Sequence, residues 1–252
     1  MKTAILITAR LKSTRLPFKV LKEIKGKPML FHMVERLKLS KKPEQIILCT
    51  SAVTQDNPLE EFANNNAIEC FRGHPDDVLL RLTEAANKYN VDTVINCTAD
   101  NPFVDPIYID CIIDFHINND LDFTKSRGLP FGACSYALKY DAMKKVCEIK
   151  DDVDTEIWGG FFTQSGFFSC GTMEVKDKDV FWPELRLSVD TPEDFQLIEK
   201  IFDYLYKPDK IFSLSDIVDL CRKHSELPLI NANVVQKKDT HTHLKRRLAE
   251  IS

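Results

Sequence analysis

Short apolar runs alternate with longer amphipathic segments along the first half of the chain. The runs are at most six residues long, and they lie at Ala4–Thr8, Gln45–Thr50, Ala67–Phe71 and Thr93–Thr98. Between them, apolar residues recur at three-and-four spacing in Met29–Leu39 and Val78–Tyr89, which indicates helices. Strands that alternate with helices predict βαβ units, and hence an α/β fold with a mainly parallel sheet covered by helices on both faces.

The second half is less regular. Its patterns predict helices at Pro106–Asn118 and Asp154–Phe162, and strands at Phe131–Leu138, Gly166–Met173 and Leu185–Val189. Thr191 followed by a proline and two acids is typical of a helix start, and this helix is expected to run to about Tyr206. A capped amphipathic helix is expected at Ser213–Lys223, and a basic, helix-like segment from Gln236 onward.

Composition and charge narrow the class of protein. The chain has 252 residues, of which 44% are hydrophobic and 29% charged, as in ordinary globular domains. A net charge of -4 gives no attraction to a polyanion, so neither nucleic acid nor an anionic membrane is expected as a partner. The N-terminal apolar run ends at Ala9 and is too short for a signal peptide or a membrane span. We therefore expect a cytoplasmic protein, whose eight scattered cysteines are reduced core residues.

A cluster of cations follows the first strand. Four basic residues lie within ten positions of one another beside two hydroxyls, and they are Arg10, Lys12, Arg15 and Lys19 with Ser13 and Thr14. Ligands of parallel sheets bind at the carboxyl ends of the strands. Guanidinium, ammonium and backbone N–H groups there would suit a triphosphate. A solvated basic loop is the alternative.

Two acids follow two other predicted strands. Asp100 comes just after the strand at 93–98 and Asp190 just after the strand at 185–189, so both could project over the same crevice of the sheet. Mg²⁺ prefers one or two carboxylates together with water and phosphate oxygens. An Asx turn at Asp100 and a helix N-cap at Asp190 are the structural alternatives.

The string from Ala9 to Lys19, A-R-x-x-S-T-R-L-P-x-K, and the Gly-Lys-Pro-Met that begins at Gly26 resemble a known nucleotide-binding signature. It is that of the cytidylyltransferases that activate sialic acid and 3-deoxy-manno-octulosonate, and most closely of their SpsF-like relatives in spore coat polysaccharide biosynthesis. The similarity continues at 71–81, 98–106 and 186–194, and so spans residues 1 to about 200. The glycine-rich signature of the sugar-1-phosphate uridylyl- and guanylyltransferases is absent, which favours cytosine.

The resemblance implies a Rossmann-like fold of the nucleotide-diphospho-sugar transferase type. It also implies a Mg²⁺-dependent enzyme that transfers CMP from CTP to a small anionic acceptor and releases pyrophosphate, in surface polysaccharide biosynthesis. A homodimer is possible. The expected nucleotidyltransferase domain is 1–210 with an acceptor-binding insert at about 122–171, and 211–252 is a helical extension packed on it.

The resemblance also assigns site residues. Nucleotide binding is expected from Thr8, Ala9, Arg10, Ser13, Arg15, Lys19, Arg72, Asp77, Thr98 and Asp100. Catalytic roles are expected for Arg10, Lys19, Asp100 and Asp190, and the two aspartates would hold the metal. For Arg72 and Asp77, a turn followed by a helix cap is the structural alternative.

The acceptor pocket is implied to lie in the insert. Its candidates are Lys125, Arg127, Tyr136, Glu156 and Trp158. The two cations could hold an anionic acceptor and the indole could form a wall, whereas a surface charge pair and a core aromatic are the alternatives.

The sequence departs from the SpsF-like pattern at two places. Asp154–Trp158 stands where many relatives carry a Glu-His-Val-Thr type string, so the acceptor can differ. Phe18 stands where glycine is usual, and we expect an ordinary backbone conformation there. A phosphorylated small metabolite, which would give a CDP conjugate, is slightly favoured over a 2-keto sugar acid, which would give a CMP-sugar.

Two other function classes are open. A metal-dependent glycosyltransferase would normally present Asp-x-Asp after a strand, and residues 98–102 lack it. A non-catalytic nucleotide-binding module would be favoured if the cations and acids were degraded, but all of them are present.

Overall fold

The computed structural model describes residues 1–236, and a seven-stranded sheet of order β5-β4-β1-β6-β8-β7-β9 forms its centre. The strands are β1 Thr3–Thr8, β4 Gln45–Ser51, β5 Glu69–Gly73, β6 Thr93–Thr98, β7 Phe123–Arg127, β8 Tyr136–Lys139 and β9 Cys170–Glu174. The helices are α1 Met29–Leu37, α2 Asn57–Asn65, α3 Val78–Lys88, α4 Pro106–Asn118, α5 Tyr140–Ile149, α6 Gly159–Thr163, α7 Pro192–Leu205 and α8 Leu214–Lys223. The smaller elements are the hairpin of β2 Glu23–Ile24 and β3 Lys27–Pro28, and the 3₁₀ turns η1 Lys19–Leu21 and η2 Thr54–Asp56.

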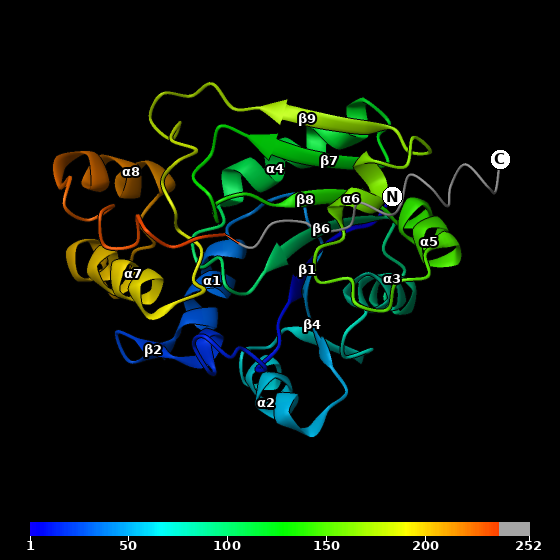
Figure 1. Ribbon diagram of the computed structural model, residues 1–252, viewed down its shortest axis with the longest axis horizontal. Coiled ribbons are helices and arrows are strands. Elements are labelled where there is room, and N and C mark those ends of the chain that lie inside the picture. Colours follow the sequence, from blue (N-terminus) through cyan, green and yellow to red (C-terminus); the bar gives the residue numbers. More distant parts are fainter. Residues whose placement is uncertain (237–252) are drawn as a thin grey trace.

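The sheet is mixed but mainly parallel. β5, β4, β1 and β6 run parallel, β8 is antiparallel to both β6 and β7, and β7 is parallel to β9. Six strands therefore end at the same edge, where β8 begins. We call this the carboxyl edge. In Figure 1 β9 and β7 lie at one end of the sheet and β4 lies toward the other. The predicted α/β class is confirmed.

Two hydrophobic cores lie on the two faces of the sheet. Ile5 and Ile7 of β1 join the core that contains apolar residues of α1, α2, α4, α7 and α8, whereas Ala4 and Leu6 join the core under α3, α5 and α6. Successive side chains of a strand point to opposite faces. A strand buried on both sides therefore reads as a continuous apolar run, which is why β1 was predictable.

The regular first half was predicted well and the second half less so. The expected strand at Ala67 begins at Glu69 because Ala67 has a left-handed backbone with φ 52°. α2, β7 and α5 were not predicted. Of the helix expected at Asp154–Phe162, only the stretch that begins at Gly159 is helical.

Two strand predictions need correction. The strand expected at Phe131–Leu138 begins at Tyr136, and Leu185–Val189 forms no strand but a single bridge between Phe131 and Arg186. The reason is Gly132, whose φ is 95° and whose missing Cβ would lie 2.6 Å from Ser188 N. The chain turns out of the sheet there, and the 185–190 segment packs closely against the turn.

The helices α7 and α8 of the C-terminal part cover the core that contains Ile5 and Ile7. α7 begins with the predicted cap, since Thr191 and Asp194 form a reciprocal capping box, and α8 packs against α7. The basic segment expected from Gln236 lies almost wholly outside the described residues. Within residues 1–236, no helix is long and apolar enough to cross a membrane.

The cysteines are free thiols in the structure. Cys49, Cys97 and Cys221 are buried as expected, but Cys111 and Cys170 are exposed, so the core assignment was wrong for these two. Both cysteines lie in segments whose sequence suggested burial. Cys111 precedes two isoleucines on α4, and Cys170 begins β9, which is an edge strand.

Candidate active site

The cationic loop after β1 is held in place by the buried carboxylate of Asp56. Leu11 N donates to Asp56 Oδ1 at 2.8 Å, and Ser51 Oγ donates to the other carboxylate oxygen. Ala9 N donates to Cys49 O at 3.2 Å and continues the β1–β4 ladder. The loop backbone therefore has a fixed starting point at the carboxyl edge.

The Lys19 ammonium lies where three segments of the chain meet. Its Nζ contacts Asp100 Oδ2 at 2.9 Å and Asp190 Oδ1 at 3.0 Å, and it donates to Val189 O at 2.7 Å. Val189 N donates to Asp100 O at 2.8 Å, which holds the two acid-bearing segments side by side. The structure thus brings together the cation and both predicted metal ligands.

Two arginines complete the surroundings of Asp190. Arg15 lies 3.1 Å from Asp190 Oδ1, and Arg186 donates to Oδ2 at 2.9 Å. Burial by itself raises the pKa of the Asp190 carboxyl, but Lys19 and the two arginines outweigh burial and hold it below its ordinary value. Asp190 is therefore ionised at neutral pH. Arg186 was not among the predicted site residues.

Asp194, the capping acid of α7, positions this group. Its buried carboxylate accepts hydrogen bonds from Arg186, from the backbone N–H groups of Asp190 and Thr191, and from Asn231 Nδ2 at 2.8 Å. The helix cap and the site are thus one network. The Thr-Pro-Glu-Asp sequence predicted the cap that includes Asp194, but no sequence pattern indicated that Asn231 belongs to the network.

The four cations of the loop divide into two groups. Arg15 and Lys19 contact Asp190, whereas Arg10 NH1 and Lys12 Nζ contact Asp76 Oδ1 at 3.0 and 2.8 Å. Asp76 lies between β5 and α3, so Arg10 faces the β5 end of the carboxyl edge, away from Asp190.

The hydroxyl residues lie on adjacent strand ends. Thr8 and Thr98 are register partners, and Ala99 N donates to Thr8 O at 2.9 Å. Thr98 Oγ1 accepts from Asn101 Nδ2 at 2.7 Å, and Ser13 Oγ accepts from Leu16 N at 3.3 Å. These groups line the same edge as the acids.

Arg72 and Asp77 have structural partners. Arg72 Nε donates to Ser51 O and its NH1 contacts Glu60 at 2.7 Å. Asp77 is buried, caps α3 through Leu80 N, and accepts from Thr155 Oγ1. These contacts match the turn-and-cap alternative, and a role beside the nucleotide stays a prediction for both.

Phe18 corrects an expectation. Its φ is 55° and its ψ 23°, so the backbone is left-handed and not ordinary. Phe18 O accepts from Leu21 N at 2.9 Å, because the loop must turn here into η1, which carries Lys19. A left-handed residue other than glycine costs about 1–2 kcal/mol. The turn is therefore kept although the usual glycine is missing.

The acceptor candidates occupy the β8–β7 end of the carboxyl edge. Lys125 and Tyr136 are cross-strand partners, whose side chains share a face of the sheet. Among the described residues, the Lys125 ammonium has no hydrogen bond or ion pair. Arg127 is paired with Glu174. Burial raises the pKa of Tyr136 to about 12, so its phenol stays protonated.

Trp158 and Glu156 differ in placement. Trp158 is 6% exposed and packs edge-on against Phe123 and Tyr136, as the core-aromatic alternative describes. Glu156 lies exposed before α6.

One further residue of this region was not predicted. Asn96 of β6 lies opposite Tyr136, and its Nδ2 donates to Leu6 O at 3.2 Å. Its Oδ1 is buried and has no hydrogen-bond partner within residues 1–236. A buried carbonyl without a donor is costly. A ligand hydroxyl could satisfy it.

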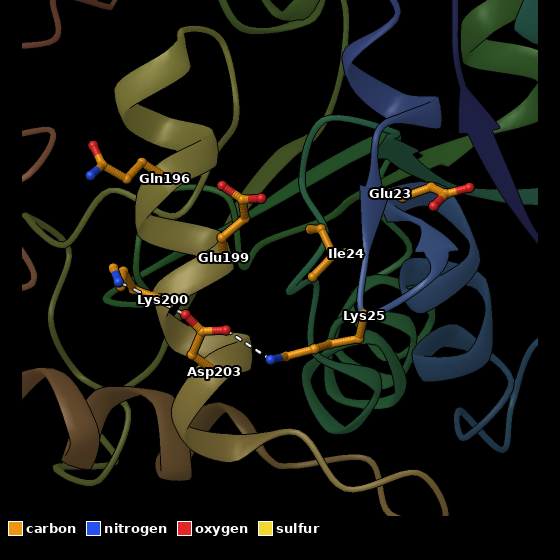
Figure 2. Close-up of a pocket in the computed structure, with 7 residues that line it drawn as sticks. All are labelled: Glu23, Ile24, Lys25, Gln196, Glu199, Lys200 and Asp203. Atoms are coloured by element: carbon orange, nitrogen blue, oxygen red, sulfur yellow. Dashed lines mark hydrogen bonds and ion pairs between the residues drawn. The ribbon is translucent and has the colours of Figure 1, made fainter.

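Two surface pockets lie away from these residues. Figure 2 shows one of about 440 Å³ between the β2–β3 turn and α7, where Lys25 is paired with Asp203 at 2.7 Å. The other, of about 380 Å³, is lined by Lys176, Lys178, Phe181 and Arg222. Neither contains a predicted site residue.

The geometry defines a class of protein. Cations and two acids converge at the carboxyl edge of a mainly parallel sheet, which is the arrangement of an α/β enzyme that binds a nucleotide. The chain belongs to the cytidylyltransferase family, because the sequence model of that family, described as "Cytidylyltransferase", matches residues 4–224.

Individual relatives agree with this assignment. An uncharacterized protein of Methanocaldococcus jannaschii is 30% identical over 242 residues, which cover 94% of this chain and 97% of that protein. The spore coat polysaccharide biosynthesis protein SpsF of Bacillus subtilis is 26% identical over 229 residues, 88% of this chain and 94% of SpsF. A solved cytidylyltransferase from Leptospira borgpetersenii superposes with a TM-score of 0.82 at 26% identity, covering 94% of this chain and 100% of that one.

Proposed function

We propose that this protein transfers CMP from CTP to a small anionic acceptor, with release of pyrophosphate, in the synthesis of a surface polysaccharide. The convergence of Lys19, Asp100 and Asp190 at the carboxyl edge carries the proposal. Membership of the cytidylyltransferase family supports the choice of CTP. The name of the SpsF relative supports the polysaccharide context.

The donor set fits a magnesium ion. Within residues 1–236 there is no cluster of three or more His, Cys, Asp and Glu side chains suited to a metal. Mg²⁺ bound with a nucleotide needs only one or two carboxylates, since water and phosphate oxygens supply the remaining ligands. Asp100 and Asp190, which already share one cation, would hold it. The ion would neutralise charge on the phosphates.

The reaction needs positioning and charge neutralisation. An acceptor oxygen attacks the α-phosphorus of CTP in line, the bond from that phosphorus to the bridging oxygen breaks, and pyrophosphate leaves with the electron pair. Arg10, Arg15 and Lys19 stabilise charge on the triphosphate and on the leaving pyrophosphate. Thr8, Ala9, Ser13 and Thr98 line the same edge and are proposed to bind the nucleotide.

The acceptor would bind at the β8–β7 end. Lys125 supplies a cation with no partner of its own in the described part of the chain, Tyr136 a neutral phenol and Asn96 an unsatisfied carbonyl oxygen. This set suits a molecule with one anionic group and at least one hydroxyl. Because Asp154–Trp158 departs from the SpsF-like string, we favour a phosphorylated acceptor, which gives a CDP conjugate, over a 2-keto sugar acid.

Pyrophosphate release tests the proposal. The full chain is incubated with Mg²⁺, each of the four nucleoside triphosphates, and pools of sugar phosphates, phosphorylated amino acid derivatives and 2-keto sugar acids. Release with CTP and one pool is the expected result, and product mass separates a CDP conjugate from a CMP-sugar. Preference for another nucleotide would overturn the proposal, as would silence in every pool together with no thermal stabilisation by CTP.

A further inference from the structure

Lys19 has no N–H left for a ligand. An ammonium has three donors, and Lys19 has three oxygen acceptors within 3.0 Å, from Asp100, Asp190 and Val189. Its side chain is only 12% exposed. The group expected to hold a phosphate is therefore fully engaged by the protein.

The same ammonium neutralises the two acids. Among the described residues, Lys19 is the one ion-pair partner of Asp100, whereas Asp190 also contacts Arg15 and Arg186. Without Lys19, the Asp100 carboxylate would lose its ion-pair partner in a partly buried site beside Asp190, which would keep Arg15 and Arg186.

We infer that Lys19 is a stand-in for the divalent cation: in the nucleotide-free protein its ammonium occupies the place between Asp100 and Asp190 that the metal takes when the nucleotide binds. This inference rests on the proposed function, which assigns the two acids to the metal. Its consequence is that metal and nucleotide bind as a coupled pair.

The coupling between metal and nucleotide binding depends on which acceptors the displaced Lys19 ammonium can reach. A metal ion between the acids must displace Lys19, and in the free protein the displaced ammonium loses two carboxylate partners and gains only water. When a triphosphate is present, its oxygens receive the ammonium on its flexible four-carbon stem. The metal therefore binds better with nucleotide than without, and the coupling is reciprocal.

Mn²⁺ affinity of the nucleotide-free full chain tests the inference, read from the loss of the free-ion signal in electron paramagnetic resonance. Lys19→Met should bind Mn²⁺ at least about tenfold more tightly than the wild type, within the usual range of coupling between sites. The matched control is Lys12→Met, which removes the same charge from the same loop; within residues 1–236 the Lys12 ammonium contacts only Asp76. It should stay within about twofold of the wild type, because exposed charges are screened. Equal affinities in Lys19→Met and the wild type would overturn the inference, and so would an equal gain in both variants.

A second substitution separates this inference from the metal assignment. Asp100→Asn in the Lys19→Met background should abolish the gain. If the gain survives, Mn²⁺ binds elsewhere and both ideas fail. If Lys19→Met gives no gain but Asp100→Asn weakens Mn²⁺ binding in the presence of CTP, the metal assignment stands and the stand-in role fails. Lys19→Gln replaces Lys19→Met, with the same interpretations, if the methionine variant does not fold.

Discussion

The two ends of the carboxyl edge differ in how their polar side chains are satisfied. In the nucleotide half, formed by the 9–19 loop with Asp100 and Asp190, charged groups are tied to one another, as Lys19 is to both acids. In the acceptor half, formed by Asn96, Lys125 and Tyr136, the Asn96 carbonyl oxygen has no donor and the Lys125 ammonium no acceptor within residues 1–236.

This difference between the two halves indicates separate roles, with catalysis in the nucleotide half and specificity in the acceptor half. A network that is paired before the ligand arrives fixes the positions of the acids and arginines, even though Lys19 exchanges partners when the ligand binds, and preorganised charge is what stabilises a transition state. Groups without partners reward the ligand that supplies them and penalise one that does not. We therefore expect substitutions in the nucleotide half to affect rate, and those in the acceptor half to affect the choice of acceptor.

The largest effect is expected from Asp100→Asn. Loss of one charge-positioning group typically lowers the rate by about 10²–10³-fold, and the fold should survive because the side chain is at the surface of the site. Pyrophosphate release with CTP and the active acceptor pool measures the rate. The control is Asp219→Asn on α8, an exposed acid paired with Lys223, which should retain full activity. A fully active Asp100→Asn would remove Asp100 from the site.

A group outside both halves should make the stability of the protein depend on pH. His116 of α4 is buried, bonds Thr124 of β7 at 2.9 Å, and burial lowers its pKa to about 4. An unfolded histidine titrates near pH 6.5, so the unfolded chain binds the extra proton between these values. Stability is full above pH 6.5 and should fall by roughly 3 kcal/mol as the pH drops toward 4.

Urea unfolding at several pH values measures this loss in the wild type and in His116→Gln. The glutamine variant can keep the bond to Thr124 but cannot titrate. Its stability should therefore change less across this window. Parallel curves for the two proteins would show that His116 does not cause the loss.

Lys125→Met should sharpen the distinction between the halves. Loss of the one hydrogen bond or ion pair to a charged acceptor group should raise the acceptor KM by about tenfold, with the KM for CTP unchanged. Lys144→Met on α5, an exposed lysine of another surface, is the matched control. Arg127→Met should have a smaller effect, because its guanidinium is already paired with Glu174. An equal rise in the KM for CTP would place Lys125 in the nucleotide half instead.

The smallest effect concerns Phe18 in the nucleotide half. Phe18→Gly and Phe18→Ala both remove a ring that is 47% exposed, but only glycine relieves the left-handed backbone. The glycine variant should be more stable than the alanine variant by about 1 kcal/mol, as measured by thermal unfolding. The reverse order would mean that the left-handed conformation costs nothing here.

The sequence predicts the nucleotide half better than the acceptor half. β1 and β6 are buried on both faces and appear as apolar runs. Asp100 follows β6, and Lys19 and Asp190 lie in segments that match the family signature. β7 has the sequence Phe-Thr-Lys-Ser-Arg, with one apolar residue in five. It therefore has no apolar run from which a strand could be predicted. α5 begins at Tyr140 directly after β8, without a turn residue between them.

The missing site residues depend on contacts between distant parts of the chain. Asn231 reaches Asp194 across 37 positions, and Asn96 of β6 is opposite Tyr136 only because β8 runs antiparallel. Arg186 is four positions before Asp190, but its contact with that acid depends on the turn of the chain between them. Such placements arise from packing, and local patterns do not encode them.

Binding of CTP with Mg²⁺ to the wild type and to Asp100→Asn tests the central claim most directly, because it requires no knowledge of the acceptor. Isothermal titration calorimetry with the four nucleoside triphosphates should show CTP as the tightest ligand of the wild type. Asp100→Asn should bind CTP with Mg²⁺ at least about tenfold more weakly, because it removes one of the two carboxylates that would hold the metal, and the coupling between metal and nucleotide is reciprocal. Unchanged CTP affinity in Asp100→Asn would contradict the placement of the nucleotide at the Lys19, Asp100 and Asp190 cluster.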